Sequence, residues 1–457
     1  MRHMLRLAIV PGYLVLCCLF GGASAAGYWG NMALQLIGLV IIFFALASEP
    51  PAPLSRPARQ LMALLIAILA YVGLELLPLP PGLWTALPGR ADVAAQLAIA
   101  GQPLPWLPLS LDPYRTIGSA LSLIPPIAVF LAMVRLGAFR ALWIAVVIVA
   151  IAIVSIFIGA GQVSGSEESP LYFYAITNFG KAVGFFANSN HLGTLMVVSI
   201  PLLAAIVLRA RARGTGLRKM SALWIAALAG LAVLLVGIAI NRSLAAAGLT
   251  VPALILTAFV LPARSGRKAI IGTALAGLLF AAALAVIFIA PVGSDLFSNT
   301  PQPAGSSRSI FYAVTWHAVR DFFPTGTGLG TFQQIYHRYE DPAVVDSLYV
   351  NHAHNDYLEL LLETGPVAWL FIAAFLLWLA AQMRRLWSQE GGEQFGRGAA
   401  IAILVMMFHS IVDYPLRTAA LAAIFAACCG LLADVRSSAR RGSRDEPVDR
   451  ARHLEAD

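Results

Sequence analysis

Two histidines lie two residues apart in a polar stretch of a chain that is otherwise strongly hydrophobic. This stretch runs from Asn351 to Gly365 and includes His352 and His354. Imidazole titrates near neutral pH, so either histidine could take a proton from a hydroxyl nucleophile. The alternative is an interfacial histidine without a chemical role. A zinc site is disfavoured, because neither an HExxH motif nor a cysteine lies nearby.

The two acids that follow the histidines have a simpler interpretation. Asp356 is placed to cap the helix that begins there, with Glu359 as its reciprocal partner three residues later. We therefore expect this pair to start a helix rather than to do chemistry.

Two arginines are candidates for binding an anion. Arg242 separates two apolar runs at the tip of a tight hairpin, on the side of the membrane where positive charge is disfavoured. Arg308 begins an expected helix over residues 309–323, with Ser306 and Ser307 as N-caps, and a helix N-terminus also favours anions. A guanidinium fits phosphate oxygens. The alternatives are a lipid-headgroup contact for Arg242 and a solvated loop position for Arg308.

Together these residues point to a task in which arginines hold a diphosphate and a histidine deprotonates a hydroxyl. Nucleotide sugars are cytoplasmic, whereas these residues are expected outside. A lipid-linked diphosphate sugar in the outer leaflet would fit both requirements.

The composition identifies a polytopic membrane protein. Hydrophobic residues make up 59% of the 457 residues and charged residues 12%, against about 25% charged in soluble domains. The mean hydropathy is +0.78. The net charge of +8 reflects short basic loops on one side of the membrane, not nucleic-acid binding. The adjacent pairs Cys17-Cys18 and Cys428-Cys429 lie in apolar runs and are expected to be ordinary apolar residues.

We expect about twelve membrane-spanning helices, most of them near the roughly 20 residues that cross a bilayer, with the eleventh shorter than the others. The expected spans are 5–24, 30–48, 60–78, 116–134, 141–160, 182–208, 221–240, 243–262, 269–290, 358–381, 398–412 and 418–434. A cytoplasmic N-terminus places most of the 31 Lys and Arg inside. The first span resembles a secretory signal, but we expect it to stay uncleaved.

The expected domain organisation is one integral-membrane domain over residues 1–434. Residues 79–115 form a proline-rich outer loop, and residues 291–357 form a larger one that leads to the histidines. Residues 435–457 are a basic tail on the cytoplasmic side, expected to be disordered.

The histidine segment resembles the signature of the O-antigen ligase/polymerase superfamily of bacterial membrane glycosyltransferases. The matching pattern is His352-x-His354-Asn355 followed by Glu363-x-Gly365. Further parts of the resemblance, which spans roughly residues 180–420, are Asn188-x-Asn190-His191, Arg242 in its hairpin, Arg308 followed by Trp316, and Gly326-x-Gly328-x-Gly330. The resemblance implies an all-α, GT-C-like membrane bundle with a large periplasmic loop.

The resemblance also implies roles for individual residues. Family members move a glycan from undecaprenyl diphosphate to an acceptor sugar hydroxyl. Arg242 and Arg308 would hold the donor diphosphate, His354 would be the base, and His352 would support the acceptor side. The chemistry would be inverting and metal-independent, without a cofactor, and Asn355 and Asn190 would have supporting roles.

A second motif lies between the last two expected spans. It places Asp413 and Arg417 in a short outer loop, where they would either stabilise each other or help to line the donor pocket. Together with Ser110-Leu-Asp112-Pro113, this motif looks like exopolysaccharide-type members of the superfamily.

The predicted function is therefore that of an inner-membrane O-antigen ligase with a periplasmic active site. The acceptor would be a glycan such as lipid A–core, and membrane lipids but no nucleic acid would be partners. The alternatives are a polymerase of lipid-linked repeat units and transfer to a protein such as a pilin. A secondary transporter is disfavoured, because transporters place polar residues near the bilayer midplane.

Overall fold

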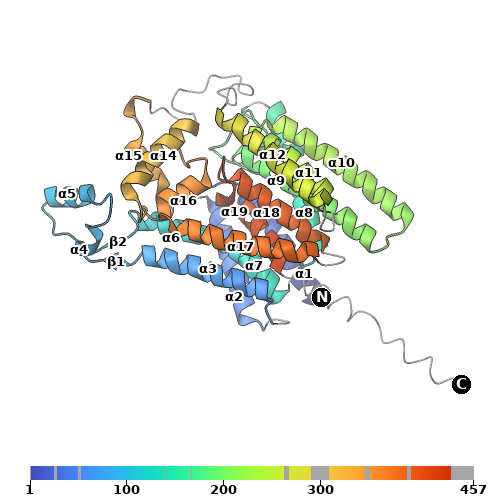
Figure 1. Ribbon diagram of the computed structural model, residues 1–457, viewed down its shortest axis with the longest axis horizontal. Helices are drawn as coiled ribbons and strands as arrows, with labels where there is room; N and C mark the ends of the chain where they lie inside the picture. The colour runs from blue at the N-terminus through green and yellow to red at the C-terminus, as the bar shows by residue number, and fades with distance from the viewer. Residues whose placement is uncertain are drawn as a thin grey trace.

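The computed structural model describes residues 2–24, 28–49, 53–137, 139–165, 167–261, 267–289, 308–344, 350–388 and 393–433, and these are mostly helical (Figure 1). The first helices are α1 (Arg2–Phe20), α2 (Trp29–Ala47), α3 (Arg56–Glu75), α4 (Pro81–Trp84), α5 (Ala91–Ile99), α6 (Pro113–Ser122), α7 (Ile124–Leu136) and α8 (Ala141–Ser164). The later ones are α9 (Ser189–Ala212), α10 (Leu217–Asn241), α11 (Leu244–Ile255), α12 (Arg267–Ile289), α14 (Arg308–Phe322), α15 (Phe332–Tyr339), α16 (Asp356–Thr364), α17 (Val367–Ser388), α18 (Gln394–His409) and α19 (Ala419–Ala433). Short elements are β1 (Pro78–Leu79), β2 (Leu107–Pro108), η1 (Leu256–Val260), η3 (Pro342–Val344) and η4 (Pro415–Arg417).

Among the described residues, seven helical segments are long and apolar enough to cross a membrane. They are Trp29–Ala47, Arg56–Glu75, Pro113–Leu136, Ala141–Ser164, Ser189–Ala212, Leu217–Asn241 and Val367–Ser388. Shorter apolar helices are Arg6–Phe20, Leu244–Phe259, Ile271–Ala283, Gln394–His409 and Ala419–Ala433. The all-α membrane class is confirmed, whereas the number of twelve spans stays a prediction.

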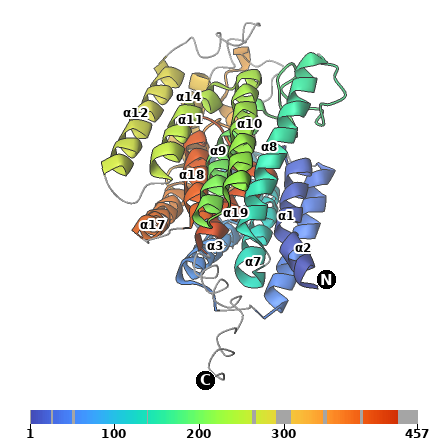
Figure 2. The same ribbon diagram turned by 90° about the vertical axis from the view of Figure 1, so that its right-hand side faces the viewer.

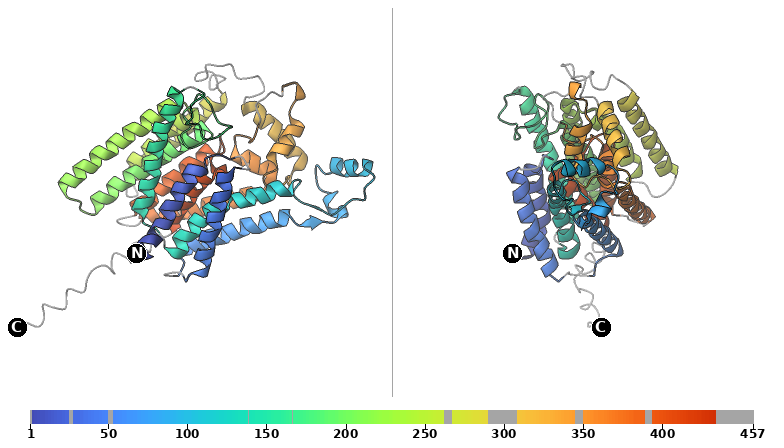
Figure 3. Two further views of the ribbon diagram at one scale, coloured as in Figure 1. Left: turned by 180° about the vertical axis from the view of Figure 1, so that it is seen from behind. Right: turned by 90° about the vertical axis from the view of Figure 1, so that its left-hand side faces the viewer.

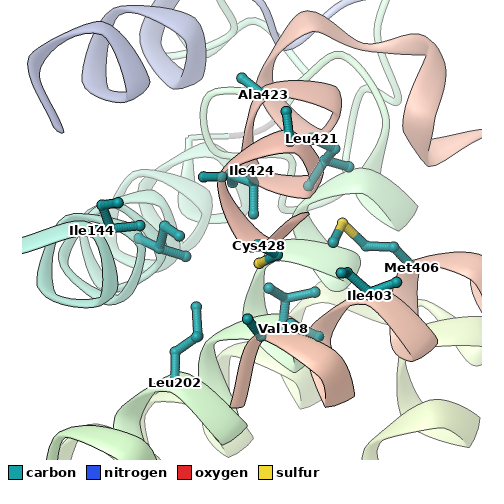
Figure 4. Packing of buried hydrophobic residues seen from close by; sticks show 14 of the residues in the cluster. Ile144, Val198, Leu202, Ile403, Met406, Leu421, Ala423, Ile424 and Cys428 are labelled. Atoms are coloured by element: carbon teal, nitrogen blue, oxygen red, sulfur yellow. The ribbon is translucent and has the colours of Figure 1, made fainter. Parts of the chain in front are cut away.

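Helix α9 is the centre of the bundle, packed against α8, α10, α11 and α18. Its side chains are buried over most of its length, as expected of a helix that is apolar on all sides. Figure 4 shows the core where α8, α9, α18 and α19 meet, with Ile144, Val198, Ile403 and Ile424 close together around Cys428. The four cysteines are free and buried, as predicted.

The outer layer of the bundle consists of helix pairs that pack along their length. Figure 2 shows α11 beside α12, α8 beside α10, and α1 beside α2. Helix α17 lies against α3 on another side of the body. These outer helices expose large apolar side chains, for example Phe43 of α2 and Leu377 of α17, as helices that face lipid do.

The non-spanning elements gather at one end of the bundle. Helices α14 and α15, the short antiparallel pair β1–β2, α4 and α5 lie there, and the turn between α9 and α10 lies at the opposite end (Figures 1 and 3). Helix α14 falls where the sequence predicts a helix over residues 309–323. Phe311, Phe322, Phe332 and Tyr336 form a small core under α14 and α15, in contact with Leu362 of α16. Ser306 and Ser307, the predicted caps, are outside the described residues.

The predicted span over residues 358–381 is wrong, because two helices replace it. Helix α16 ends at Thr364, Gly365 has φ 60° and ψ −148°, and α17 starts at Val367. A Cβ on Gly365 would lie 1.9 Å from the carbonyl oxygen of Pro324, so only glycine fits this break. Gly326 also has a positive φ and packs on the carbonyl of Glu363. The loop after α14 therefore seats directly on the break between α16 and α17.

Candidate active site

The polar segment enters α16 through a cap different from the predicted one. The side chain of Asn355, not Asp356, accepts hydrogen bonds from the backbone N–H groups of Tyr357 and Leu358, each at 3.1 Å. Asp356 is the first helical residue, and its backbone N–H donates to the carbonyl of Ser410 at 2.9 Å. Asparagine and aspartate are equally good caps, so the sequence alone could not decide between neighbours. Asn355 therefore fixes the start of α16 directly after the histidine segment.

Three aromatic residues and an uncommon backbone conformation constrain His354. Its backbone has φ 52°, an uncommon conformation for a non-glycine residue. Its ring stacks on Phe311, with centroids 5.7 Å apart, and meets Tyr414 edge-on at 4.9 Å. The hydroxyl of Tyr312 donates to the His354 carbonyl at 3.0 Å. Such a constrained imidazole is oriented before any substrate arrives.

Asp413 faces the Nδ1 of His354. The Oδ1 of Asp413 lies 3.5 Å from that nitrogen, and the carboxylate is fully buried. Burial raises the pKa of Asp413, but the neighbouring His354, with His191 and His409, lowers it well below its usual range. The buried carboxylate is thus ionised at neutral pH. The arrangement leaves Nε2 of His354 for a reacting group, as in histidine–carboxylate pairs of known enzymes.

His352 is fixed by a different acid. Its Nδ1 lies 2.8 Å from Oε1 of Glu359, and its ring packs on Tyr414 with centroids 4.2 Å apart. Oε2 of Glu359 accepts from the backbone N–H of Ala353 at 2.8 Å. Glu359 was predicted to be half of a capping box, and the structure shows instead that it holds the histidine loop. Tyr414 therefore lies between the two histidines and contacts both.

The predicted contact between Asp413 and Arg417 is wrong, because each has other partners. Arg417 forms ion pairs with Asp356 at 3.0 Å, Glu359 at 3.0 Å and Glu363 at 3.2 Å. It thereby ties η4 to one face of α16. Positions 356, 359 and 363 share a helix face because they are three and four residues apart, a spacing that the sequence displays but that gives no indication of the partner.

The three carboxyl groups paired with Arg417 have pKa values that are shifted in different directions. Burial raises the pKa of Glu359, but Arg417 and His352 lower it by more, so the net shift of this pKa is downward. Burial raises the pKa of Glu363 to about 7 and that of Asp356 to about 6, although Arg417 lowers both. Asp356 and Glu363 therefore gain or lose their protons between about pH 6 and pH 7.

Arg242 lies at the tip of the α10–α11 hairpin, as predicted. It is exposed and has φ 56°. The hairpin is anchored on both sides of it: Asn241 donates to the carbonyls of Ala182 and Ser189, and Ser243 donates to Oδ1 of Asn190 at 2.6 Å. Asn190 thus supports the hairpin through Ser243, so its effect on a ligand at Arg242 would be indirect.

Arg308 opens α14 close to both the histidine site and Lys181. Its positive charge lowers the pKa of Tyr312, which burial raises to about 12. Burial lowers the pKa of Lys181, and the charges of Arg308 and Arg242 lower it further. The charges of the two predicted arginines therefore act on a lysine that sequence reasoning missed, since Lys181 lies in an irregular loop far from both arginines in the chain.

Comparison with known proteins bears on this arrangement. Residues 229–373 match a family model described as O-antigen ligase. This segment is similar to the O-antigen ligase family. The resemblance predicted from the sequence is thereby confirmed, and a membrane protein of glycosyltransferase type is supported. A search of curated proteins found no match to the chain.

The O-antigen ligase match contains part of the site and leaves part outside. Arg242, Arg308, His352 and His354 lie within residues 229–373. Asp413 and Arg417 lie beyond the match, as do Asn190 and Lys181. Contacts in the folded chain join the two groups of residues, for instance between His354 and Asp413.

A pocket of about 850 Å³ opens beside His352, on the side of the bundle formed by α2, α3, α6 and α17. Its walls are apolar and include Leu64, Ile68, Phe371 and Phe375. Its polar end is lined by Arg115, Asn351, His352, Glu359 and Arg417. The pocket thus combines an apolar body at the level of the spanning helices with a polar end at His352. In the described residues, no group of three or more His, Cys, Asp and Glu side chains has a metal-binding arrangement.

Proposed function

We propose that the protein transfers a glycan from an undecaprenyl-diphosphate-linked donor to a sugar hydroxyl of an acceptor, in the manner of an O-antigen ligase. The reaction would take place at the periplasmic face of the bacterial inner membrane. The observation that carries the proposal is the contact of His354 with the buried carboxylate of Asp413. Arg308 begins helix α14, whose Phe311 and Tyr312 contact His354 one turn later, and the charges of Arg308 and Arg242 both act on Lys181. A base beside an anion site is what displacement of a diphosphate by a hydroxyl needs.

In this proposal His354 is the general base. Its Nε2 accepts the proton of the acceptor hydroxyl while Asp413, opposite Nδ1, stabilises the imidazolium that forms. General-base assistance of this kind contributes about 10²–10⁴-fold to a rate. The stacked ring of Phe311 and the edge contact of Tyr414 keep the imidazole in place during the transfer.

Arg308 and Arg242 would bind the donor diphosphate. The acceptor oxygen forms a bond to the anomeric carbon as the bond from that carbon to the phosphate oxygen breaks. The electron pair remains on the phosphate, where guanidinium groups stabilise the negative charge. Attack from the face opposite the diphosphate inverts the configuration at the anomeric carbon.

The acceptor would approach from the pocket at His352. An apolar pocket body at the level of the spanning helices suits a lipid-anchored acceptor such as lipid A–core. Arg115, Asn351 and His352 at the polar end offer hydrogen bonds to the sugar. A lipid-linked repeat unit has the same general shape, so polymerase activity is the second candidate. Transport is not proposed, since the candidate residues cluster at one end of the bundle.

The test is a deletion strain complemented with wild type, His354→Ala or Arg308→Ala. We expect only wild type to restore surface polysaccharide, and lipid-linked intermediates to accumulate with both variants. Polymeric lipid-linked glycan would identify a ligase, and single repeat units a polymerase. His317→Ala and Arg320→Ala are matched controls, because both residues are exposed on the same helix α14. Full complementation by the His354 and Arg308 variants would refute the proposal.

A further inference from the structure

Lys181 lies in a loop that is held firmly between α8 and α9. Gln162 of α8 is fully buried and makes four hydrogen bonds to this loop. Its Oε1 accepts from the N–H groups of Val183 and Gly184, at 2.9 and 2.8 Å, and its Nε2 donates to the carbonyls of Leu171 and Gly184. The hydroxyl of Tyr172 also donates to the Lys181 carbonyl at 3.0 Å. The backbone at Lys181 is therefore well defined.

The same loop is bonded to the hairpin that carries Arg242. The Nδ2 of Asn241 donates to the Ala182 carbonyl at 2.7 Å. Lys181 precedes Ala182 in the chain and Arg242 follows Asn241. The two cationic residues therefore flank one buried hydrogen bond, which fixes the distance between their backbones.

Lys181 is surrounded by positive charge. Its pKa is lowered first by burial, then by Arg308 and then by Arg242. Among the described residues no carboxylate lies within the 4.0 Å of an ion pair with it. The carboxylate of Glu167 lies near Gly180, 3.6 Å from where a Cβ on that glycine would be. In the part of the chain that the structure describes, Lys181, Arg242 and Arg308 form no ion pair with an acid, so these half-buried or exposed cations can attract an anion.

The charge of the proposed donor changes during the reaction. A diphosphate esterified at both ends has one negative charge on each phosphate. When the bond from the anomeric carbon to the phosphate oxygen breaks, the phosphate that held the sugar becomes the free terminal phosphate of the lipid diphosphate, with about 1.5–2 negative charges at pH 7. Two arginines balance the substrate, so a third cation is matched to the charge that appears only as the leaving group departs.

Resting on the proposed function, we infer that Lys181 is the third cation of the diphosphate site and stabilises the leaving terminal phosphate. As the acceptor oxygen bonds to the anomeric carbon and His354 takes its proton, the electron pair of the broken bond settles on a phosphate oxygen next to the Lys181 ammonium. An interaction that strengthens only as the leaving group departs raises kcat and leaves KM nearly unchanged.

Steady-state transfer by the purified full-length protein in detergent micelles gives the first readout. Lys181→Met should lower kcat by about 10²–10³-fold, the usual cost of one lost charge-stabilising donor, with KM for the lipid-linked donor within about twofold. Lys181→Arg should restore most of the rate. A lower affinity for the donor with unchanged kcat would overturn the inference, and so would wild-type kinetics.

Binding of two short ligands tests the charge argument without the reaction. Farnesyl diphosphate has a free terminal phosphate, and its terminal methyl ester has one negative charge fewer. Wild type and Lys219→Met, a change in an exposed lysine in the first turn of α10, should prefer farnesyl diphosphate by about tenfold, as one extra charge contact of about 1.4 kcal/mol gives. Lys181→Met should lose this preference.

The outcomes separate the inference from the proposed function. If Lys181→Met weakens both ligands equally, or neither, the inference is overturned. If Arg308→Ala leaves the binding of both ligands unchanged, the donor site itself is refuted. Unchanged melting temperatures of all variants would show that the differences come from the site and not from misfolding.

Discussion

Asp413 is the residue on which the proposed base depends most directly. It is fully buried, 3.5 Å from the Nδ1 of His354, and its low pKa keeps it ionised. Asp413→Asn replaces the anion by a neutral amide of the same shape. We expect the transfer rate to fall by about 10²–10⁴-fold, as when a carboxylate behind a catalytic histidine is neutralised.

Rate measurements on the purified protein check this prediction against Asp321→Asn. Asp321 is an exposed acid of α14 whose carboxylate accepts from the Tyr339 hydroxyl. Asp321→Asn should keep the wild-type rate. A wild-type rate for Asp413→Asn would show that His354 does not need the carboxylate.

The acids beside Arg417 predict a pH dependence of stability. The pKa values of Asp356 and Glu363, about 6 and about 7, are raised mainly by burial above their ordinary values of 3.8 and 4.5. At these two acids the folded protein therefore binds more protons than the unfolded chain between these limits, so their contribution to stability falls as pH rises from about 4 to 7. This contribution should lower the melting temperature at pH 8 relative to that at pH 5.5.

Glu363→Gln isolates the contribution of one acid to this trend. The amide resembles the protonated carboxyl, so the decrease in melting temperature over the same pH range should be smaller than in wild type. An equal decrease in the variant would mean that other groups cause the trend.

The individual residues show which parts of a site a sequence can reveal. His354, Arg242 and Arg308 have unusual types for their positions, and that is enough to single them out. The sequence does not reveal the contacts around them. These contacts depend on how distant segments meet in the fold, as at the Asn355 cap, the Arg417 ion pairs and Lys181. Asp413 and Arg417 lie four residues apart in the chain, yet they have different partners. Asp413 faces His354, whereas Arg417 pairs with acids of α16.

At the scale of elements, the break between α16 and α17 determines where the histidines lie. A prediction from hydropathy joins both helices into one span, because the hydropathy of the residues carries no information about the backbone conformation at Gly365. That residue has φ 60° and no room for a Cβ beside Pro324. The break turns α16 out of line with α17, so that one face of α16 meets Arg417 and the other meets the loop after α14.

Replacement of Gly365 by alanine should therefore destabilise the protein by at least about 1–3 kcal/mol, the cost of a residue in a strained backbone region. The clash with the Pro324 carbonyl adds to it. Gly73→Ala in the exposed part of α3, where a Cβ meets nothing within 4 Å, is the control and should cost nothing. Thermal unfolding of both variants measures the difference; equal melting temperatures would contradict the strained geometry at Gly365.

At the scale of the whole molecule, the structure has a polar end and an opposite end joined by apolar helices. Helices α14 and α15 mark the first, and the turn after α9 marks the second (Figure 3). The positive-inside pattern predicts that α14 faces the periplasm and this turn faces the cytoplasm. Composition predicted the all-helical class, since lipid-facing helices must be apolar, whereas the tilts and packing of the helices depend on side-chain fit.

Cysteine labelling tests this orientation. The four native cysteines are buried, so background labelling should be low. In intact cells with a permeable outer membrane, a membrane-impermeant maleimide should label Arg320→Cys of α14 but not Arg213→Cys of the α9–α10 turn; both positions are exposed. The opposite pattern would place the histidine site in the cytoplasm.

The central claim, that His354 is the base of a glycan transfer, is tested most directly by chemical rescue. The measurement is turnover of a lipid-linked donor by purified wild type, His354→Gly and His317→Gly, each with and without added imidazole. We predict that His354→Gly loses about 10²–10⁴-fold in rate, that imidazole restores part of the loss, and that His317→Gly behaves as wild type. Wild-type turnover by His354→Gly without imidazole would contradict the claim.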